Sequence, residues 1–94
     1  MSKHYTFGWK TVRQVIAKTN GKCFYCGCDL PADTEFFDEY GNLFSSVRNW
    51  HVDHILPLSK GGNHKIDNLV PACRTCNLSK YTKTADEFIA TRAL

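Results

Sequence analysis

The first periodic stretch of hydrophobic positions lies at residues 9–20 and has the spacing of a helix. Its side chains at i, i+3, i+4 and i+7 form one stripe, with the basic residues off it: Val12, Val15, Ile16 and Thr19. Gly21 follows at once, and glycine is common just after a helix because it adopts the left-handed conformation without strain. The pattern predicts a helix from Trp9 to Asn20.

The second half of the chain holds short apolar runs separated by turn-forming residues. Residues 49–56 have the composition of a strand that Pro57 ends, and residues 69–71 form a second, shorter run. A helix is expected to begin at the cysteine pair after the second run and to continue to about Tyr81. Strand, loop, strand and helix over 49–81 predict a ββα unit.

Two further segments complete the expected architecture. Residues 27–46 are irregular and acidic, with a Tyr40-Gly41-Asn42 turn signal that suits a loose hairpin. Thr84-Ala85-Asp86-Glu87 has the spacing of a capping box for a last helix through Arg92. The chain shows no internal repeat or linker. We therefore expect an α+β fold, one domain over residues 1–94 with a helix before and after the ββα core.

Composition and charge narrow the class of protein. The chain has 94 residues, of which 43% are hydrophobic and 22% charged, as in ordinary soluble globular domains. No apolar run approaches the ~18–20 residues of a membrane helix, and no secretory signal is visible. These features predict a cytoplasmic protein without a membrane partner.

Charged residues are segregated along the chain. Residues 1–28 hold five bases and no acid, residues 29–39 hold five acids and no base, and residues 48–83 are again mostly basic. Such segregation suits one face that meets a polyanion and another that does not. Small soluble domains are often slightly basic as well, so the net charge of +3 does not choose between these readings.

Four of the five cysteines form two pairs of equal spacing, Cys23-Phe24-Tyr25-Cys26 and Cys73-Arg74-Thr75-Cys76. In a reducing compartment, two such pairs predict four thiolates around a structural Zn²⁺. A bound metal also contributes folding free energy to a chain too short for a large core. A redox dithiol is the alternative, and the two equal pairs and the lack of a βαβ pattern argue against it. Cys28 is expected to be a spare thiol, with substitution as a zinc ligand the other reading.

Three polar side chains near these elements are candidates for chemistry. His54 is a candidate base because an imidazole titrates near ~6.5. The Asp53 carboxylate and the Asn77 amide oxygen are candidate ligands for Mg²⁺ or Mn²⁺. Neighbouring strand residues point to opposite faces, so Asp53 and His54 serve one site only if the strand ends there.

An ordered series of motifs runs from the first cysteine pair to residue 81. It consists of Val52-Asp53-His54-Ile55-Leu56-Pro57-Leu58-Ser59-Lys60-Gly61-Gly62, Asp67-Asn68-Leu69-Val70, and Cys73-Arg74-Thr75-Cys76-Asn77 with Lys80. The series resembles the HNH endonucleases, which are ββα-metal nucleases, and within them the subgroup with a four-cysteine zinc. The resemblance implies a metal-dependent DNA endonuclease that nicks or cuts both strands. Its expected setting is a bacterial cell or phage-infected host, with double-stranded DNA as partner and a monomeric or homodimeric state.

The resemblance also implies a role for each motif residue. His54 is expected to deprotonate the attacking water and Asp53 to bind the catalytic Mg²⁺ or Mn²⁺. Asn68 is expected to tie the loop between the strands and to orient the base. Asn77 occupies the last motif position, where many members have His and others Asn, and both bind the metal. Tyr81 stands where some members have a further His, so only two protein ligands are expected.

Four more side chains are candidates for nucleic-acid contacts: His51, Lys60, Arg74 and Lys80. For each of the three cationic side chains, a solvated surface charge is an equally good interpretation. His64 is expected to be merely exposed. Two other functions stay open, namely a non-catalytic zinc-knuckle module that binds nucleic acid through the same basic face, and an RNase that uses the same site.

Overall fold

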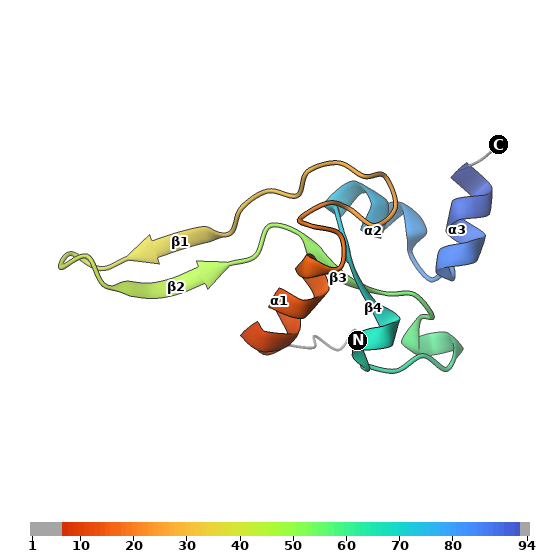
Figure 1. The fold of residues 1–94 in the computed structure, drawn as a ribbon, viewed down its shortest axis with the longest axis horizontal. Helices are drawn as coiled ribbons and strands as arrows, with labels where there is room; N and C mark the ends of the chain where they lie inside the picture. The colour runs from red at the N-terminus through yellow and green to blue at the C-terminus, as the bar shows by residue number, and fades with distance from the viewer. Residues whose placement is uncertain (1–6, 93–94) are drawn as a thin grey trace.

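The computed structural model describes residues 7–92, which form three helices and two separate two-stranded antiparallel sheets (Figure 1). The helices are α1 (Trp9–Ala17), α2 (Arg74–Lys80) and α3 (Ala85–Arg92). The first sheet pairs β1 (Thr34–Phe37) with β2 (Leu43–Val47), and the second pairs β3 (His51–His54) with β4 (Leu69–Ala72). The small α+β fold expected from the sequence is confirmed. None of the helices in this range is long and apolar enough to cross a membrane.

Strands β3 and β4 and helix α2 form the predicted ββα unit. The register runs from His51 opposite Ala72 to His54 opposite Leu69, and every residue of β4 is buried. Strand β3 is shorter than the predicted 49–56, because β4 offers only four residues for pairing. Helix α2 starts after Cys73, whose sulfur accepts a hydrogen bond from the Cys76 amide at 3.4 Å.

Helix α1 lies against β4 and ends earlier than predicted. It stops at Ala17 rather than at Asn20, because turns follow in which Asn20 and Gly21 both take the left-handed conformation, with φ of 52° and 81°. Val15 on its inner face is buried with Leu69 of β4 and Trp50. The helix thus closes one side of the strand pair that carries the motif residues.

Helix α3 begins at the predicted capping box. The Thr84 amide donates to Oε1 of Glu87 at 2.8 Å, and the Glu87 amide donates to Oγ1 of Thr84 at 3.1 Å. The helix buries Phe88 against a second cluster that contains Ala72 of β4 and two of the cysteines. Strand β4 therefore contributes to both hydrophobic clusters, one at each of its ends.

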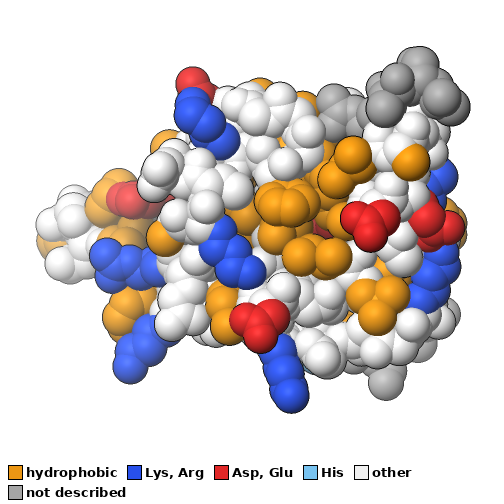
Figure 2. Space-filling view, turned by 45° about the vertical axis from the view of Figure 1, so that its right-hand side comes forward, with side chains coloured by type: hydrophobic (Ala, Val, Ile, Leu, Met, Phe, Trp, Pro, Cys, Tyr) orange, Lys and Arg blue, Asp and Glu red, His pale blue; other side chains and the backbone are white. Residues whose placement is uncertain are grey.

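Strands β1 and β2 form the predicted hairpin, and it projects from the rest of the molecule as an arm (Figure 1). The described chain measures 51 × 27 × 24 Å as a result. The turn is held by Asp38, whose Oδ1 accepts from the amides of Tyr40 and Asn42 at 2.9 and 2.8 Å. Both strands are exposed along their whole length, and hydrophobic side chains reach the surface among charged ones (Figure 2).

Candidate active site and metal centre

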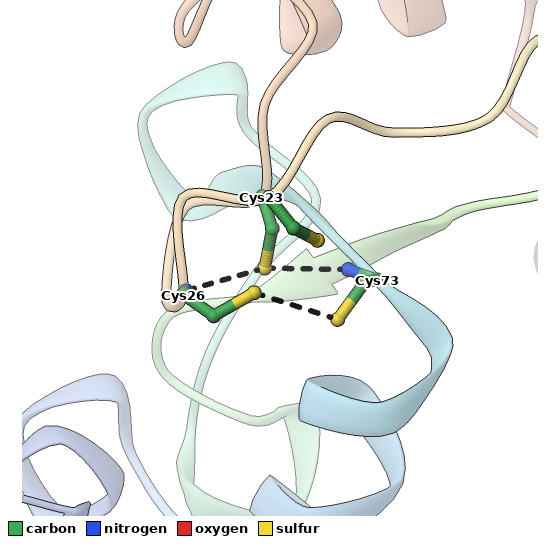
Figure 3. Close-up of side chains that lie close together, drawn as sticks. Cys23, Cys26 and Cys73 are labelled. Atoms are coloured by element: carbon green, nitrogen blue, oxygen red, sulfur yellow. Dashed lines mark hydrogen bonds between the residues drawn. The ribbon is translucent and has the colours of Figure 1, made fainter.

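Two segments far apart in the sequence bring their cysteines together. The sulfur atoms of Cys23, Cys26, Cys28 and Cys73 all lie within 4.8 Å of one another. Figure 3 shows the Cys23, Cys26 and Cys73 side chains converging from the two segments. Backbone amides of Cys26 and Cys73 donate to Sγ of Cys23 at 3.5 and 3.4 Å, an arrangement that stabilises negative charge on sulfur. Soft thiolate donors at this spacing fit a zinc ion.

The cluster contains one more thiol than a tetrahedral zinc requires. Cys76, buried on the first turn of α2, interacts with the sulfur atoms of Cys73, Cys23 and Cys26, and burial raises its pKa. Cys28, expected to be a spare thiol, lies within the group as well. Hydrogen bonds from the backbone and thiol of Cys28 lower the pKa of Cys26 to about 6, while the bond to Cys26 raises the pKa of Cys28 to about 12. The four sulfur atoms within 4.8 Å of one another therefore include Cys28, and Cys76 of the predicted ligand set is not among them.

Asp53 lies on the inner side of β3 and is only 7% exposed. Three donors from other segments surround its carboxylate. Tyr25 donates its hydroxyl, Asn77 donates Nδ2 at 3.3 Å, and the Lys80 ammonium lies 3.2 Å from Oδ2. Burial, followed by the hydrogen bond to Asp53, raises the pKa of Tyr25 well above its usual value. The phenol therefore stays protonated and keeps donating.

Lys80 was a candidate for a phosphate contact or for a solvated charge, and the structure places it in the interior instead. Its side chain is 1% exposed, and its ammonium also donates to the carbonyl oxygen of His54 at 2.8 Å. Lys80 lies four residues after Cys76 and three after Asn77, so all three occupy one face of α2. That face packs against β3. The helical spacing from two motif residues is the signal that could have placed Lys80 inside.

His54 lies at the end of β3, which meets the condition set for it to share a site with Asp53. Its side chain is half-buried and turns towards the loop before β4, where Nε2 lies 3.1 Å from Nδ1 of His64. Burial lowers the pKa of His54 below its usual value, and the nearby His64 lowers it further, whereas Asp53 raises it. The net shift keeps the imidazole neutral near pH 7, the form that accepts a proton. Nothing in the motif series marked His64.

Asn68 ties the loop between β3 and β4, as expected. Its Oδ1 accepts from the Leu56 amide at 2.8 Å, and its Nδ2 donates to the carbonyl oxygens of Leu56 and Asn63 at 3.0 and 2.9 Å. Gly62 is required in the same loop, because a Cβ there would lie 1.8 Å from the carbonyl oxygen of Leu56. The segment that follows His54 is therefore held in one shape.

A family model described as HNH endonuclease matches residues 23–83, which include both cysteine pairs, Asp53, His54, Asn68 and Asn77. The chain belongs to the HNH endonuclease family. The predicted family is confirmed, and residues 7–22 and 84–92 of the described chain lie outside the match.

Two curated relatives are similar over most of this chain. One is the SPbeta prophage-derived protein YoqL of Bacillus subtilis (strain 168), 36% identical over 69 residues, which are 73% of this chain and 27% of that protein. The other is the type IV methyl-directed restriction enzyme EcoKMcrA of Escherichia coli (strain K12), 33% identical over 76 residues, which are 80% of this chain and 24% of that protein. The chain spans about a quarter of the length of these relatives.

HNH nucleases use metal ions, and the donors in this HNH site fit a hard divalent cation. Asp53 offers carboxylate oxygens, and the Asn77 amide lies 3.3 Å from one of them. A half-turn of the Asn77 amide exchanges its nitrogen for its oxygen without moving the backbone. Carboxylate and amide oxygens are the ligands that Mg²⁺ and Mn²⁺ prefer. The residues present therefore fit the ion that the family implies.

The remaining candidates lie at or near the surface of the HNH domain. Arg74 is exposed at the start of α2, and Lys60 is exposed but paired with Glu87 at 2.9 Å. His51 is half-buried, and burial together with the positive charges of Arg48 and Arg74 lowers its pKa. Being neutral near pH 7, His51 can offer a phosphate a hydrogen bond and no charge. Among the described residues, Arg74 is thus the exposed cation of the set that forms no ion pair.

Proposed function

We propose that this chain is a metal-dependent DNA endonuclease that hydrolyses phosphodiester bonds with His54 as general base. The observation that carries the proposal is the position of a half-buried His54, neutral near pH 7, directly after the buried Asp53, whose carboxylate contacts the half-buried Asn77. Double-stranded DNA is the proposed substrate, with cleavage in the cytoplasm of a bacterial cell or phage-infected host. A monomer carries one such site and would nick, whereas a homodimer would carry two.

Each residue of the site has a separate proposed role. Neutral His54 takes a proton from the water whose oxygen attacks phosphorus, and the bond to the 3′ oxygen breaks to leave 3′-hydroxyl and 5′-phosphate ends. Asp53 and Asn77 would hold Mg²⁺ or Mn²⁺, which supplies positive charge for the phosphorane and the leaving oxygen. Asn68 fixes the backbone after the base, and Lys80 holds the carbonyl oxygen of His54. Arg74, Lys60 and His51 are proposed to contact the DNA backbone or its surroundings.

The cysteine cluster is proposed to hold one structural Zn²⁺ on Cys23, Cys26, Cys73 and Cys76. The close approach of Cys28 makes it the competing ligand. Metal analysis of Cys28→Ser and Cys76→Ser separates the two sets. Loss of zinc in Cys76→Ser alone supports the proposed set, and loss in Cys28→Ser alone assigns Cys28 in its place.

Conversion of supercoiled plasmid to the nicked form tests the enzymatic proposal. Purified protein is assayed with Mg²⁺, Mn²⁺ or EDTA, with His54→Ala as the catalytic variant and Arg13→Ala on α1 as a matched surface control. We expect metal-dependent nicking that His54→Ala loses by at least about 100-fold, while zinc content and unfolding temperature stay unchanged. Full turnover by His54→Ala would overturn the mechanism.

The same assay separates the alternative functions. A double-stranded RNA of matched length, cleaved while plasmid stays intact, would assign an RNase to this site. Plasmid left intact under every metal, together with tight DNA binding and one zinc per chain, would assign a non-catalytic binding module. Linear product that appears without prior accumulation of nicked circles would indicate a dimer that cuts both strands.

A further inference from the structure

A second histidine contacts the candidate base. Nδ1 of His64 lies 3.1 Å from Nε2 of His54, and the two ring centroids are 5.0 Å apart at an interplanar angle of 70°. Phe7 packs against both rings, at centroid distances of 6.2 and 5.8 Å. The His54 ring is therefore held by one polar contact and one aromatic contact, both from segments outside β3.

The backbone around His64 is fixed by the same bonds that fix the end of β3. The Asn63 carbonyl accepts from Nδ2 of Asn68, and the Asn63 side chain accepts from the Lys65 amide at 3.0 Å. Gly62 donates its amide to the carbonyl oxygen of Pro57 at 3.0 Å. Hydrogen bonds therefore hold the loop that carries His64. The contact between the two imidazole rings follows from the fold of this loop.

A hydrogen bond between two neutral imidazoles requires one N–H and one lone pair, which leaves two arrangements. If Nδ1–H of His64 donates, Nε2 of His54 uses its lone pair and Nδ1 of His54 carries the proton. If Nε2–H of His54 donates, Nδ1 of His54 keeps its lone pair. Only the second arrangement leaves His54 a ring nitrogen that can take a proton from water.

We propose that His64 is a positioning residue that holds His54 in the Nε2–H tautomer, with Nδ1 presented to the attacking water. The inference rests on the proposed role of His54 as the base. The motifs assign the orientation of the base to Asn68, which bonds to the backbone of the loop. This inference adds a side chain of the same loop, His64, that contacts the His54 ring directly. His64 accepts one hydrogen bond in this role and does not itself take the proton from water.

Long-range ¹H–¹⁵N correlation spectra of the zinc-loaded protein report the tautomer directly, at a pH above the ordinary imidazole range. His54→Ala identifies the His54 signals. The parent protein should show a single Nε2–H tautomer at His54. His64→Leu keeps the bulk but removes the acceptor, and should give a mixture of tautomers. His64→Asn restores an acceptor oxygen at the δ position and should restore the single form.

Plasmid nicking by the same variants is the second readout. We expect His64→Leu to lower kcat by about 10- to 100-fold with little change in KM, and His64→Asn to recover most of the loss. Zinc content and unfolding temperature of His64→Leu should match those of the parent. A rise in KM alone would assign His64 to DNA contact and overturn the positioning role.

The two proposals fail in different ways. A single unchanged tautomer in His64→Leu, or the opposite tautomer in the parent, would overturn the role of His64 and leave His54 as the base. Nicking by His54→Ala at the parent rate would overturn the proposed function, whatever the spectra show. Where no DNA cleavage is detected, the spectra still decide whether His64 sets the tautomer.

Discussion

The two sheets of this protein have the same topology and opposite surroundings. Each is a pair of short antiparallel strands, yet β4 is buried at every position and β1 and β2 are exposed at every position. Pair β3–β4 is covered by α1 on one side and by α2 and the cysteine cluster on the other. The hairpin β1–β2 is held by its own turn and by contacts such as Phe36 with Phe44, whose rings are 6.5 Å apart.

The difference shows which part of an HNH domain of this size contributes most to its folding stability. A two-stranded hairpin is marginal alone in water, whereas a strand pair packed between helices and a metal centre gains from each neighbour. The chemistry-bearing residues all lie on or next to the covered pair. Changes to the buried residues of this pair should affect fold and activity together, and changes on the arm should affect neither strongly.

The largest expected effect is removal of the zinc site. Zinc binding in small domains contributes on the order of 10 kcal/mol, comparable to the whole stability of a small domain, about 5–15 kcal/mol. Cys73→Ser, or chelation of the parent protein, should therefore unfold the covered pair. Circular dichroism melts with and without zinc measure this. A zinc-free Cys73→Ser protein that melts like the parent would remove the distinction between the two regions.

The second effect concerns the buried ion pair beneath the active site. Asp53→Asn leaves the Lys80 ammonium without its carboxylate in a site where Lys80 is 1% exposed. Breaking one partner of a buried pair costs about 3–5 kcal/mol, which urea unfolding measures. The matched double variant Asp53→Asn with Lys80→Met should recover most of that stability while cleavage stays lost. Recovery of cleavage as well would show that Asp53 acts only through Lys80.

A third, local effect is expected at α3. The Thr84 amide, followed by Lys60, lowers the pKa of Glu87 to about 2. A carboxyl with a depressed folded-state pKa stabilises the fold above its unfolded value near 4.5, and that contribution is lost as pH falls towards about 2. The protection of α3 amides from exchange, measured against the intrinsic exchange rate at each pH, should fall across this window, and Glu87→Gln should abolish that dependence. The same dependence in Glu87→Gln would point to another group.

The smallest effect is expected on the arm. Phe44→Ser removes an exposed side chain whose ring lies against Phe36 on the neighbouring strand. Surface changes of this kind stay within about 0.5 kcal/mol, so zinc content, unfolding free energy and plasmid nicking should match the parent. A loss of several-fold in nicking with unchanged stability would show that the arm takes part in substrate binding.

Local spacing predicted most of the fold. The ββα unit, the hairpin turn, the capping box and both cysteine pairs depend on residues a few positions apart, and each is present. The resemblance to the HNH family named Asn68, and its side chain does tie the loop between β3 and β4. Helix and strand ends were less accurate, because α1 stops three residues early and β3 is limited by the length of its partner.

The family, the two cysteine pairs and the candidate polar residues were predicted from the sequence alone, because motif order and ligand spacing are local properties. Only the tertiary structure decided that Lys80 lies buried under Asp53, that Cys28 joins the cluster, and that His64 meets His54. Each of these contacts joins side chains whose positions depend on packing or on the folded path of a loop. The residue type of a lysine, a cysteine or a histidine does not by itself show whether the side chain faces water or another residue.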